Sequence, residues 1–278
     1  MPERREDEDI DVRASGFSAV ATTGRKWSKS AEEAAKWAAT HIGIPYTRRR
    51  TESIDEVRKR TGATFLIVAK KGILYLVTPT GELFFHPNMA HLRLKNLRFG
   101  SAGKGDHMAE AMGLAPGMSV LDCTLGFGAD AIVSSFSVGA KGHVEALESN
   151  PLIEAVVSYG LANFKAENWP IQEAMRTVQT HCADALTFLK TQEKDSFDVI
   201  YFDPMFRHPL EKSISLSPLR EVADMRALTR ETIEEAKRVA KHRVVMKENA
   251  RSAEFIRLGF EKVVGGTYSK VHYGVIEL

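Results

Sequence analysis

Residues 120–130, with the sequence VLDCTLGFGAD, decide how this chain folds. The apolar pair Val120–Leu121 ends a buried strand, and the residues from Ala129 onward predict a helix that packs back on that strand. Between them, Gly126 and Gly128 allow positive φ angles and leave no Cβ between the backbone and a ligand. A strand, a glycine turn and a helix in this order form the nucleotide site of many α/β proteins.

The same stretch leaves the kind of nucleotide open. GFGADA fits the loose dinucleotide pattern G-x-G-x-x-A, with Glu148 at a suitable distance for a ribose contact, so NAD and FAD are candidates beside S-adenosylmethionine (SAM). Asp122 precedes the first glycine and favours SAM, because the sulfonium and the amino-acid tail need nearby acceptors. A pyrophosphate instead needs N–H groups and no adjacent carboxylate. We therefore expect Asp122, Gly126 and Gly128 to bind SAM.

Length and composition predict a soluble globular protein. The chain has 278 residues, of which 44% are hydrophobic and 27% charged, and its formal net charge of +2 means that any basic surface must be local. The charged start of the chain is not typical of a signal peptide, and no apolar run approaches membrane-spanning length. Cys123 and Cys182 have no metal-ligand spacing and are expected to pack in buried strands. We expect a cytoplasmic protein without a metal or a membrane partner.

The order of segments predicts two structured regions. We expect a disordered tail at residues 1–15, a small α/β module at residues 16–88 and a helical lead-in at residues 89–116. From residue 117 to residue 278, strands and helices alternate, which is typical of a doubly wound, mostly parallel sheet. This region includes a long helix predicted over residues 219–240. Its strands are predicted at residues 119–123, 143–147, 178–182, 197–202, 243–247, 260–264 and 271–278.

Two basic segments are candidates for contacts with phosphate. Arg48, Arg49 and Arg50 follow one another in the small module, and the glycine-rich residues 99–106 have lysine and arginine around them. A run of three arginines is most often a solvated surface, and the glycine-rich segment also fits a plain linker. Both interpretations stay open at this point.

Acidic residues come directly after three of the predicted strands. They are Glu148, Asp184 and Asp203. Because the carboxyl ends of parallel strands face one crevice, we expect these side chains to lie close together. A single Asp in such a place is usually a helix cap, but three beside a glycine turn favour ligand contacts. The expected reach of each side chain suggests its role. Glu148 would accept hydrogen bonds from the ribose hydroxyls, Asp184 would accept one from the adenine amino group, and Asp203 would face the reacting centre.

The residues 198–206, with the sequence DVIYFDPMF, predict the chemistry. They resemble the D/N/S-P-P-Y/F/W signature of class I SAM-dependent methyltransferases that modify planar exocyclic amines. The lone pair of such an amine is delocalised into the ring, and the nitrogen becomes a better nucleophile when a carboxylate and a carbonyl accept its hydrogens. Asp203 and the carbonyl of Pro204 are placed for that role, and Phe206 would stack on the target base.

Longer stretches resemble the bacterial small-subunit (16S) ribosomal RNA guanine-N2-methyltransferase family, in which DPM-F/Y replaces DPP-F/Y. They are LRFGSAGKGDHMAEAMGL, VLDCTLGFGADA, ALESNPLIEAVVSYGL, DVIYFDPMFRHPLEKS and RVVMK, in the family's order within residues 90–278. The resemblance implies a Rossmann-like class I methyltransferase domain with a seven-stranded sheet, SAM as cofactor, and RNA (16S rRNA or the small ribosomal subunit) as partner. The residues before about position 85 match only loosely.

The resemblance also implies where SAM binds. Carried over residue by residue, the family's contact positions are Ala129–Asp130, Glu148–Ser149, Ala183–Asp184 and Asp203. Ala129 and Ser149 stand where the family commonly has arginine. Residues 247–249 read Lys-Glu-Asn where the family has Lys-Arg-Pro. The last difference lies on the expected RNA side, so the chain could act on another RNA.

Several functions therefore stay distinct. The preferred hypothesis is a SAM-dependent methyltransferase that acts on the N2 amino group of a guanine in 16S rRNA. The same chemistry would serve another RNA, DNA adenine or a protein glutamine. An NAD-dependent oxidoreductase would use GFGADA but leave DPMF unexplained, and a non-catalytic RNA-binding factor would keep the fold without methyl transfer.

Overall fold

The computed structural model describes residues 18–99, 105–166, 169–204 and 217–278. The tail predicted at residues 1–15 and the predicted stacking residue Phe206 lie outside the described residues. The chain divides into two compact units. The first unit consists of the described parts of residues 1–85, 155–164 and 213–222, and the second unit contains the other described residues.

The first unit is built on a four-stranded sheet with the order β1-β2-β3-β4. β1 (Ala19–Thr23) runs parallel to β2 (Phe65–Lys70). β3 (Ile73–Thr78) and β4 (Gly81–Phe84) continue from β2 as an antiparallel meander. A parallel pair needs a crossover between its strands, and two helices supply it here.

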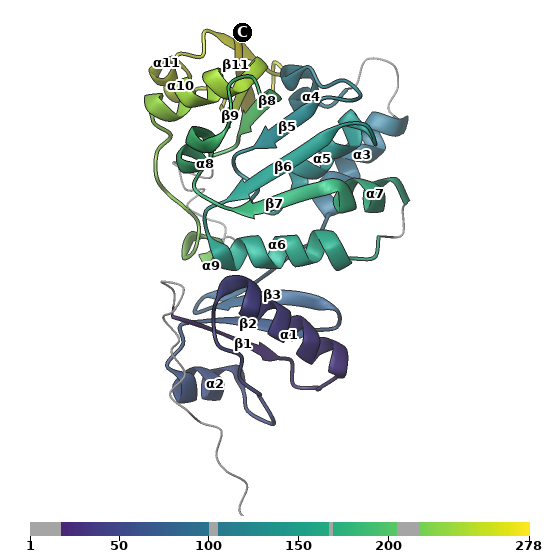
Figure 1. Ribbon diagram of the computed structural model, residues 1–278, viewed down its shortest axis with the longest axis vertical. Helices are drawn as coiled ribbons and strands as arrows, with labels where there is room; N and C mark the ends of the chain where they lie inside the picture. Colours follow the sequence, from purple (N-terminus) through teal and green to yellow (C-terminus); the bar gives the residue numbers. More distant parts are fainter. Residues whose placement is uncertain (1–17, 100–104, 167–168, 205–216) are drawn as a thin grey trace, which may run out of the picture. The chain divides into compact units, whose positions relative to one another are not determined.

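The crossover helices begin and end at local sequence signals. α1 (Lys29–Ile42) contacts β1 and β2 and lies along them in Figure 1. Ser28 caps this helix at its amino end, and Gly43 ends it with a φ of +76°. Ser53 caps α2 (Ile54–Thr61) as part of a capping box. The predicted α/β character of this module is therefore confirmed.

The second unit contains a seven-stranded sheet with the order β10-β11-β9-β8-β5-β6-β7. The neighbouring pairs from β9 to β7 are parallel, whereas β11 is antiparallel to both β9 and β10. This is the mostly parallel sheet of a Rossmann-like class I methyltransferase fold, as predicted. The strands are β5 (Ser119–Asp122), β6 (His143–Glu148), β7 (Val178–Cys182), β8 (Phe197–Phe202), β9 (Ala240–Asn249), β10 (Lys262–Val264) and β11 (Val271–Glu277).

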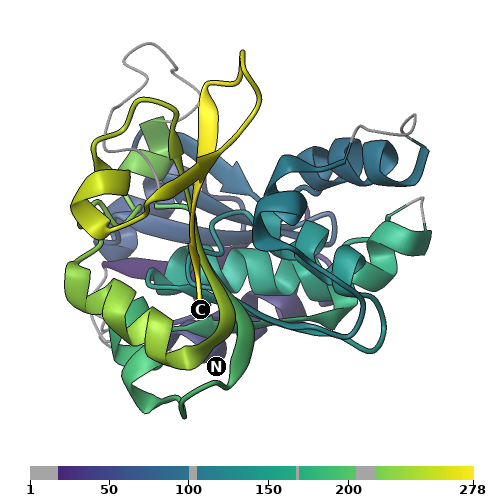
Figure 2. The same ribbon diagram turned by 90° about the horizontal axis from the view of Figure 1, so that it is seen from above.

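Helices cover both faces of this sheet (Figure 2). On one face, α8 (Ala185–Thr191), α10 (Arg230–Val239) and α11 (Glu254–Leu258) bury apolar side chains against the central strands. The other face carries α3 (Asn88–Phe99), α4 (His107–Met112), α5 (Ala129–Val138) and α7 (Trp169–Thr177). The remaining helices are α6 (Pro151–Asn163), which begins in the second unit and continues in the first, and α9 (Ser217–Arg220).

Two predictions are wrong in this part of the chain. The single helix expected over residues 219–240 is two helices, because Asp224 accepts a hydrogen bond from the amide of Arg226 and Thr229 caps the start of α10. Such side-chain bonds compete with the helical backbone. Cys123 is buried as predicted, but Cys182 is exposed, because β7 is an edge strand of the sheet.

Candidate active site

The strand order of the second unit changes direction at β5. The chain passes from β5 outward to β6 and β7, and then returns to β8 and β9 on the other side of β5. In an open parallel sheet, ligands bind at the carboxyl ends of the strands where the order reverses. The segments at this point are the glycine turn after β5 and the Asp203-Pro204 pair after β8.

Backbone hydrogen bonds fix the glycine turn between its neighbours. The amide of Cys123 donates to a carbonyl of β8 at 2.9 Å, and the amide of Leu125 donates to a carbonyl of β6 at 2.7 Å. Gly126 and Gly128 have φ angles of +49° and +76°, which other residues seldom adopt. Gly128 is also the residue from which α5 starts. The predicted strand, turn and helix are therefore confirmed.

Asp122 lies buried beneath this turn. Its Oδ1 accepts hydrogen bonds from the amide and the hydroxyl of Thr124, at 2.9 and 3.2 Å. Its Oδ2 has no hydrogen-bond partner among the described residues. Burial, with the nearby charge of Asp130, raises the pKa of Asp122 to about 7. A buried acceptor beside a glycine turn fits a ligand that brings hydrogen-bond donors, as the ammonium group of SAM does.

Asp203 is held from both neighbouring strands. Its amide donates to the hydroxyl of Thr124 at 2.6 Å, and its carboxylate accepts from Lys247 Nζ at 2.6 Å. Lys247 lies on β9, which pairs with β8. Burial raises the pKa of Asp203 to about 6, although the charge of Lys247 acts in the opposite direction. The side chain is still 31% exposed, so its carboxylate is accessible to a substrate.

Lys247 belongs to an ionic network that also holds Asp130. Asp130, in the first turn of α5, accepts from Lys247 Nζ at 3.2 Å and from the hydroxyl of Tyr201 at 2.8 Å, and it pairs with Arg93. Arg93 also binds Asp106, the residue that caps α4. Burial would raise the pKa of Asp130, but Lys247 and Arg93 outweigh it and lower that pKa.

The same network keeps Lys247 charged. Burial would lower the pKa of its ammonium group, but the carboxylates of Asp130 and Asp203 outweigh burial and raise it. Asp130 already has three protein partners. Its position is therefore suited to holding Lys247 and, through it, Asp203. Its predicted contact with SAM stays a prediction.

Glu148 lies at the end of β6, next to the glycine turn, and its side chain is nearly buried. Its Oε1 accepts from the amide of Asn150 at 3.0 Å, and the backbone amides of Gly126 and Ser149 also bond to its carboxylate. Burial is the main reason why the pKa of Glu148 is raised to about 6. This position beside the turn is compatible with the predicted ribose contact.

Asp184 lies at the end of the next strand, where the amide of Ala183 donates to a carbonyl of β6 at 3.0 Å. One carboxylate oxygen of Asp184 caps α8, and the other accepts from Arg226 at 2.8 Å. Arg226, which is 69% exposed, also pairs with Asp224, and Asp224 accepts from the hydroxyl of Ser149 at 3.4 Å. Arg226 therefore links the carboxyl ends of β6 and β7, which we expect to face the adenosine.

The structure gathers the described site residues at one edge of the sheet. Sequence reasoning did not include Thr124, Tyr201, Arg93 or Lys247 among them. A signal for Lys247 was present, because it is the last residue of the fifth predicted strand, and Asp203 directly follows the fourth. No local signal connects Arg93 with Asp130. The predicted residues brought together here are Asp122, Gly126, Gly128, Ala129, Asp130, Glu148, Ser149, Ala183, Asp184, Asp203 and Pro204.

Comparison with known proteins identifies the family. A sequence model of the SAM-dependent methyltransferase family matches residues 82–261 of the chain. The chain belongs to this SAM-dependent methyltransferase family. The Bacillus subtilis (strain 168) protein YpiP is 35% identical, over 92% of this chain and 98% of its own. Ribosomal RNA small subunit methyltransferase J of Aliivibrio fischeri (strain MJ11) is 33% identical, over 70% of each chain.

A solved structure shows the same fold. The crystal structure of a SAM-dependent methyltransferase from Neisseria gonorrhoeae has a TM-score of 0.61 at 18% identity, covering 93% of this chain and 95% of its own. Family membership makes SAM the cofactor, as predicted, and confirms the resemblance stated from the sequence. Within the described ranges, no helix has the length and apolarity to cross a membrane, and no group of three His, Cys, Asp or Glu side chains could hold a metal ion.

Asp122→Asn tests the buried carboxylate under the turn. The pKa of Asp122 is raised to about 7 in the folded chain, above the ordinary value of about 4 for an unfolded one. Stability from this group is therefore fully present below the ordinary pKa and is lost as pH rises to the folded pKa, by at most about 4 kcal/mol. The asparagine variant has no carboxyl group to ionise at this position and should not show this loss. As pH rises through the same window, its free energy of unfolding should therefore increase relative to that of the unmodified protein.

Urea unfolding at pH values on either side of this window measures the effect. Asp195→Asn, a change at an exposed turn, is the matched control and should keep the pH dependence of the unmodified protein. Identical pH dependence in the Asp122→Asn variant and the unmodified protein would contradict the raised pKa.

Proposed function

We propose that this protein transfers the methyl group of SAM to the exocyclic N2 amino group of a guanine in 16S rRNA. The observation that carries the proposal is the place of Asp203 and Pro204, at the end of β8 and beside the glycine turn, with the carboxylate bound by Lys247 at 2.6 Å. Relatives named ribosomal RNA small subunit methyltransferase J support an rRNA substrate.

The chemistry follows from what an aromatic amine lacks. When bound, SAM would supply an electrophilic methyl group on a sulfonium, and its carbon–sulfur bond would break as the nitrogen–carbon bond forms. The guanine N2 lone pair is delocalised into the ring, so the nitrogen needs acceptors for its two hydrogens before the lone pair can point at the methyl group. The Asp203 carboxylate and the Pro204 carbonyl would accept them, and Asp203 would take the proton that the methylated nitrogen releases.

The surrounding residues would orient these acceptors. The bond from the Asp203 amide to Thr124 and the ion pair with Lys247 fix both the backbone and the side chain of Asp203. A fixed acceptor holds the amine in line with the methyl group, which is where a direct transfer gains most of its rate. Phe206 would stack on the base as predicted from the sequence, although it lies outside the described residues.

A related enzyme acting on another RNA is the second candidate. Glu248 and Asn249 form the carboxyl end of β9, directly after Lys247, where the resembling family has arginine and proline. An exchange of arginine for glutamate replaces a phosphate-binding charge with one that repels phosphate. This favours a changed RNA contact on the β9 side of Asp203, with the amine chemistry retained.

Asp203→Asn tests the assigned acceptor. The amide group presents N–H donors where the substrate amine needs acceptors, so we expect methyl transfer to fall by about two to three orders of magnitude. SAM affinity, measured by calorimetry, should change only a few-fold. The substrate is rRNA, free or in small subunits, from a strain that lacks the gene, and radiolabelled methyl transfer gives the rate.

The controls separate the candidate substrates. Asp195→Asn, at the exposed turn before β8, should transfer at the unmodified rate. Nucleoside analysis of the product should give N2-methylguanosine. An unchanged rate in Asp203→Asn would contradict the proposal. Methyl groups found only in DNA adenine or in protein glutamine would contradict it as well.

Lys247→Met tests how Asp203 is kept ionised. Asp203 can take up the released proton only as a carboxylate, so transfer by the unmodified protein should rise with pH through about 6, the pKa of this group. Removal of the ammonium leaves two carboxylates facing each other, which raises that pKa and moves the rise in rate to higher pH. Single-turnover rates measured across pH give both curves. Lys241→Met, at the start of the same strand and paired with Asp198, should leave the curve in place.

A further inference from the structure

We propose that the first unit carries a second RNA-binding site, which holds a single-stranded segment by stacking a base on Trp27 and binding phosphates with Arg48 and Arg50. The site is a cavity of about 420 Å³ lined by these three residues with Thr23 and Gly24. All five belong to the first unit, whereas the candidate active site belongs to the second. The proposal rests on RNA being the substrate of the proposed function, but the binding that it predicts is measured without methyl transfer.

The floor of this cavity is the end of β1. Thr23 is buried, and the amide of Gly24 donates to the carbonyl of Ala69 on β2 at 2.8 Å. A Cβ on Gly24 would lie 2.8 Å from the Cβ of Lys70, so a side chain there would push the two strands apart. Glycine therefore lets the chain leave β1 close to β2, and the following residues form the wall that contains Trp27.

The three consecutive arginines have different surroundings. Arg49 Nε donates to the carbonyl of Glu52 at 2.7 Å, and Arg49 does not line the cavity. Arg48 and Arg50 are exposed and line it, and neither forms an ion pair with any residue in the described part of the chain. Two unpaired guanidinium groups in one cavity are suited to phosphate oxygens.

The backbone that carries these arginines is held in place. Arg60 donates to the carbonyl of Arg48 at 3.3 Å and to the carboxylate of Glu52 at 2.7 and 2.8 Å. Arg50 has a φ of +53°, a conformation that residues other than glycine adopt rarely. The segment is thus fixed from α2, and Arg48 and Arg50 are presented from a defined backbone.

Trp27 supplies the aromatic surface. Its side chain is 56% exposed, although tryptophan is one of the residues that folding usually covers. The indole Nε1 donates to Glu32 Oε2 at 2.7 Å, which fixes the orientation of the ring. An exposed and oriented aromatic ring beside cationic groups is the combination by which proteins bind single-stranded nucleic acid.

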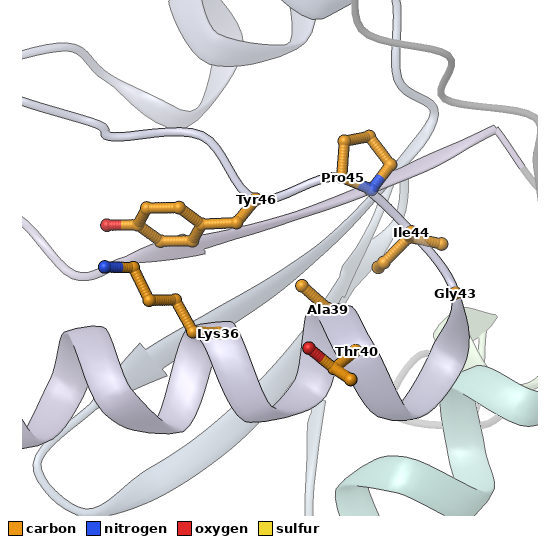
Figure 3. Close-up of a pocket in the computed structure, with 7 residues that line it drawn as sticks. All are labelled: Lys36, Ala39, Thr40, Gly43, Ile44, Pro45 and Tyr46. Atoms are coloured by element: carbon orange, nitrogen blue, oxygen red, sulfur yellow. The ribbon is translucent and has the colours of Figure 1, made fainter.

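The adjoining surface continues the same chemistry. Glu32 pairs with Lys36 at 2.8 Å, and Lys36 Nζ lies 5.5 Å from the centre of the Tyr46 ring. Figure 3 shows this lysine and tyrosine together at a second cavity, of about 500 Å³. Burial raises the pKa of Tyr46, the charge of Glu32 acts in the same direction, and the charges of Lys36 and Arg48 act in the opposite one. A strand bound at Trp27 can therefore continue toward a second cation and ring.

Two variants and a short fluorescent oligouridylate test the site. Trp27→Ala should weaken binding about tenfold, the usual effect of removing one stacked base. The double variant Arg48→Gln with Arg50→Gln should make the salt dependence of binding weaker. The negative slope of log affinity against log salt should become shallower by about 1.4, because each phosphate contact to a single strand contributes about 0.7. Circular dichroism and SAM affinity should be unchanged, since the SAM site belongs to the other unit.

A matched control removes the same charge elsewhere on the first unit. Lys59 and Lys71 are exposed and do not line the cavity, so Lys59→Gln with Lys71→Gln should leave the affinity and the salt slope nearly unchanged. An equal loss in this control would overturn the proposal by showing a general charge effect. Tighter binding to an RNA duplex than to the single strand would overturn it as well.

The outcomes distinguish this site from the proposed function. Unchanged RNA binding in Trp27→Ala and in the arginine variant overturns the second site, and methyl transfer lost in Asp203→Asn still supports the proposed function. Conversely, RNA binding that depends on Trp27 supports the second site even if the unmodified protein methylates no guanine in rRNA.

Discussion

The ammonium group of Lys247 lies between the carboxylates of Asp130 and Asp203, and the candidate active site depends on this contact. Two carboxylates this close in a buried place cannot both stay ionised near neutral pH without a cation. With Lys247 between them, the pKa of Asp203 is about 6, low enough for an acceptor in neutral solution. The contact also joins β9 to α5. The charge of Asp203 therefore depends on the strand order, which places β9 and its Lys247 beside β8.

Helix caps and predicted ligand contacts coincide at this edge of the sheet. Asp184 caps α8 with one oxygen and binds Arg226 with the other, while Glu148 accepts from the backbone amides of Gly126, Ser149 and Asn150. These bonds satisfy carboxylates that burial would otherwise disfavour and hold them in fixed positions. An acid that is oriented before a ligand arrives loses little entropy when it binds, which suits a site for a small cofactor.

The net charge of +2 does not show that the basic residues of the two units are paired differently. A chain with so little net charge has little long-range attraction for RNA, so the proposed affinity for RNA would have to come from particular groups. In the first unit, Arg48 and Arg50 form no ion pair with a described residue, whereas Arg49 and Arg60 make the structural contacts around them. In the second unit, the basic residues near Asp203 are neutralised by carboxylates. The two units therefore differ in how their arginine and lysine side chains are paired.

The sequence by itself determined the fold class, the glycine turn and the Asp203-Pro204 pair, because these depend on periodicity and on neighbouring residues. It did not determine that the helix over residues 219–240 is interrupted, since the bonds at Asp224 and Thr229 compete with a good helical pattern. Only the tertiary structure decided that Lys247 meets Asp203, 44 residues away, and that Arg93 meets Asp130, 37 residues away. Strand order and helix packing, which no local pattern encodes, bring those charges together.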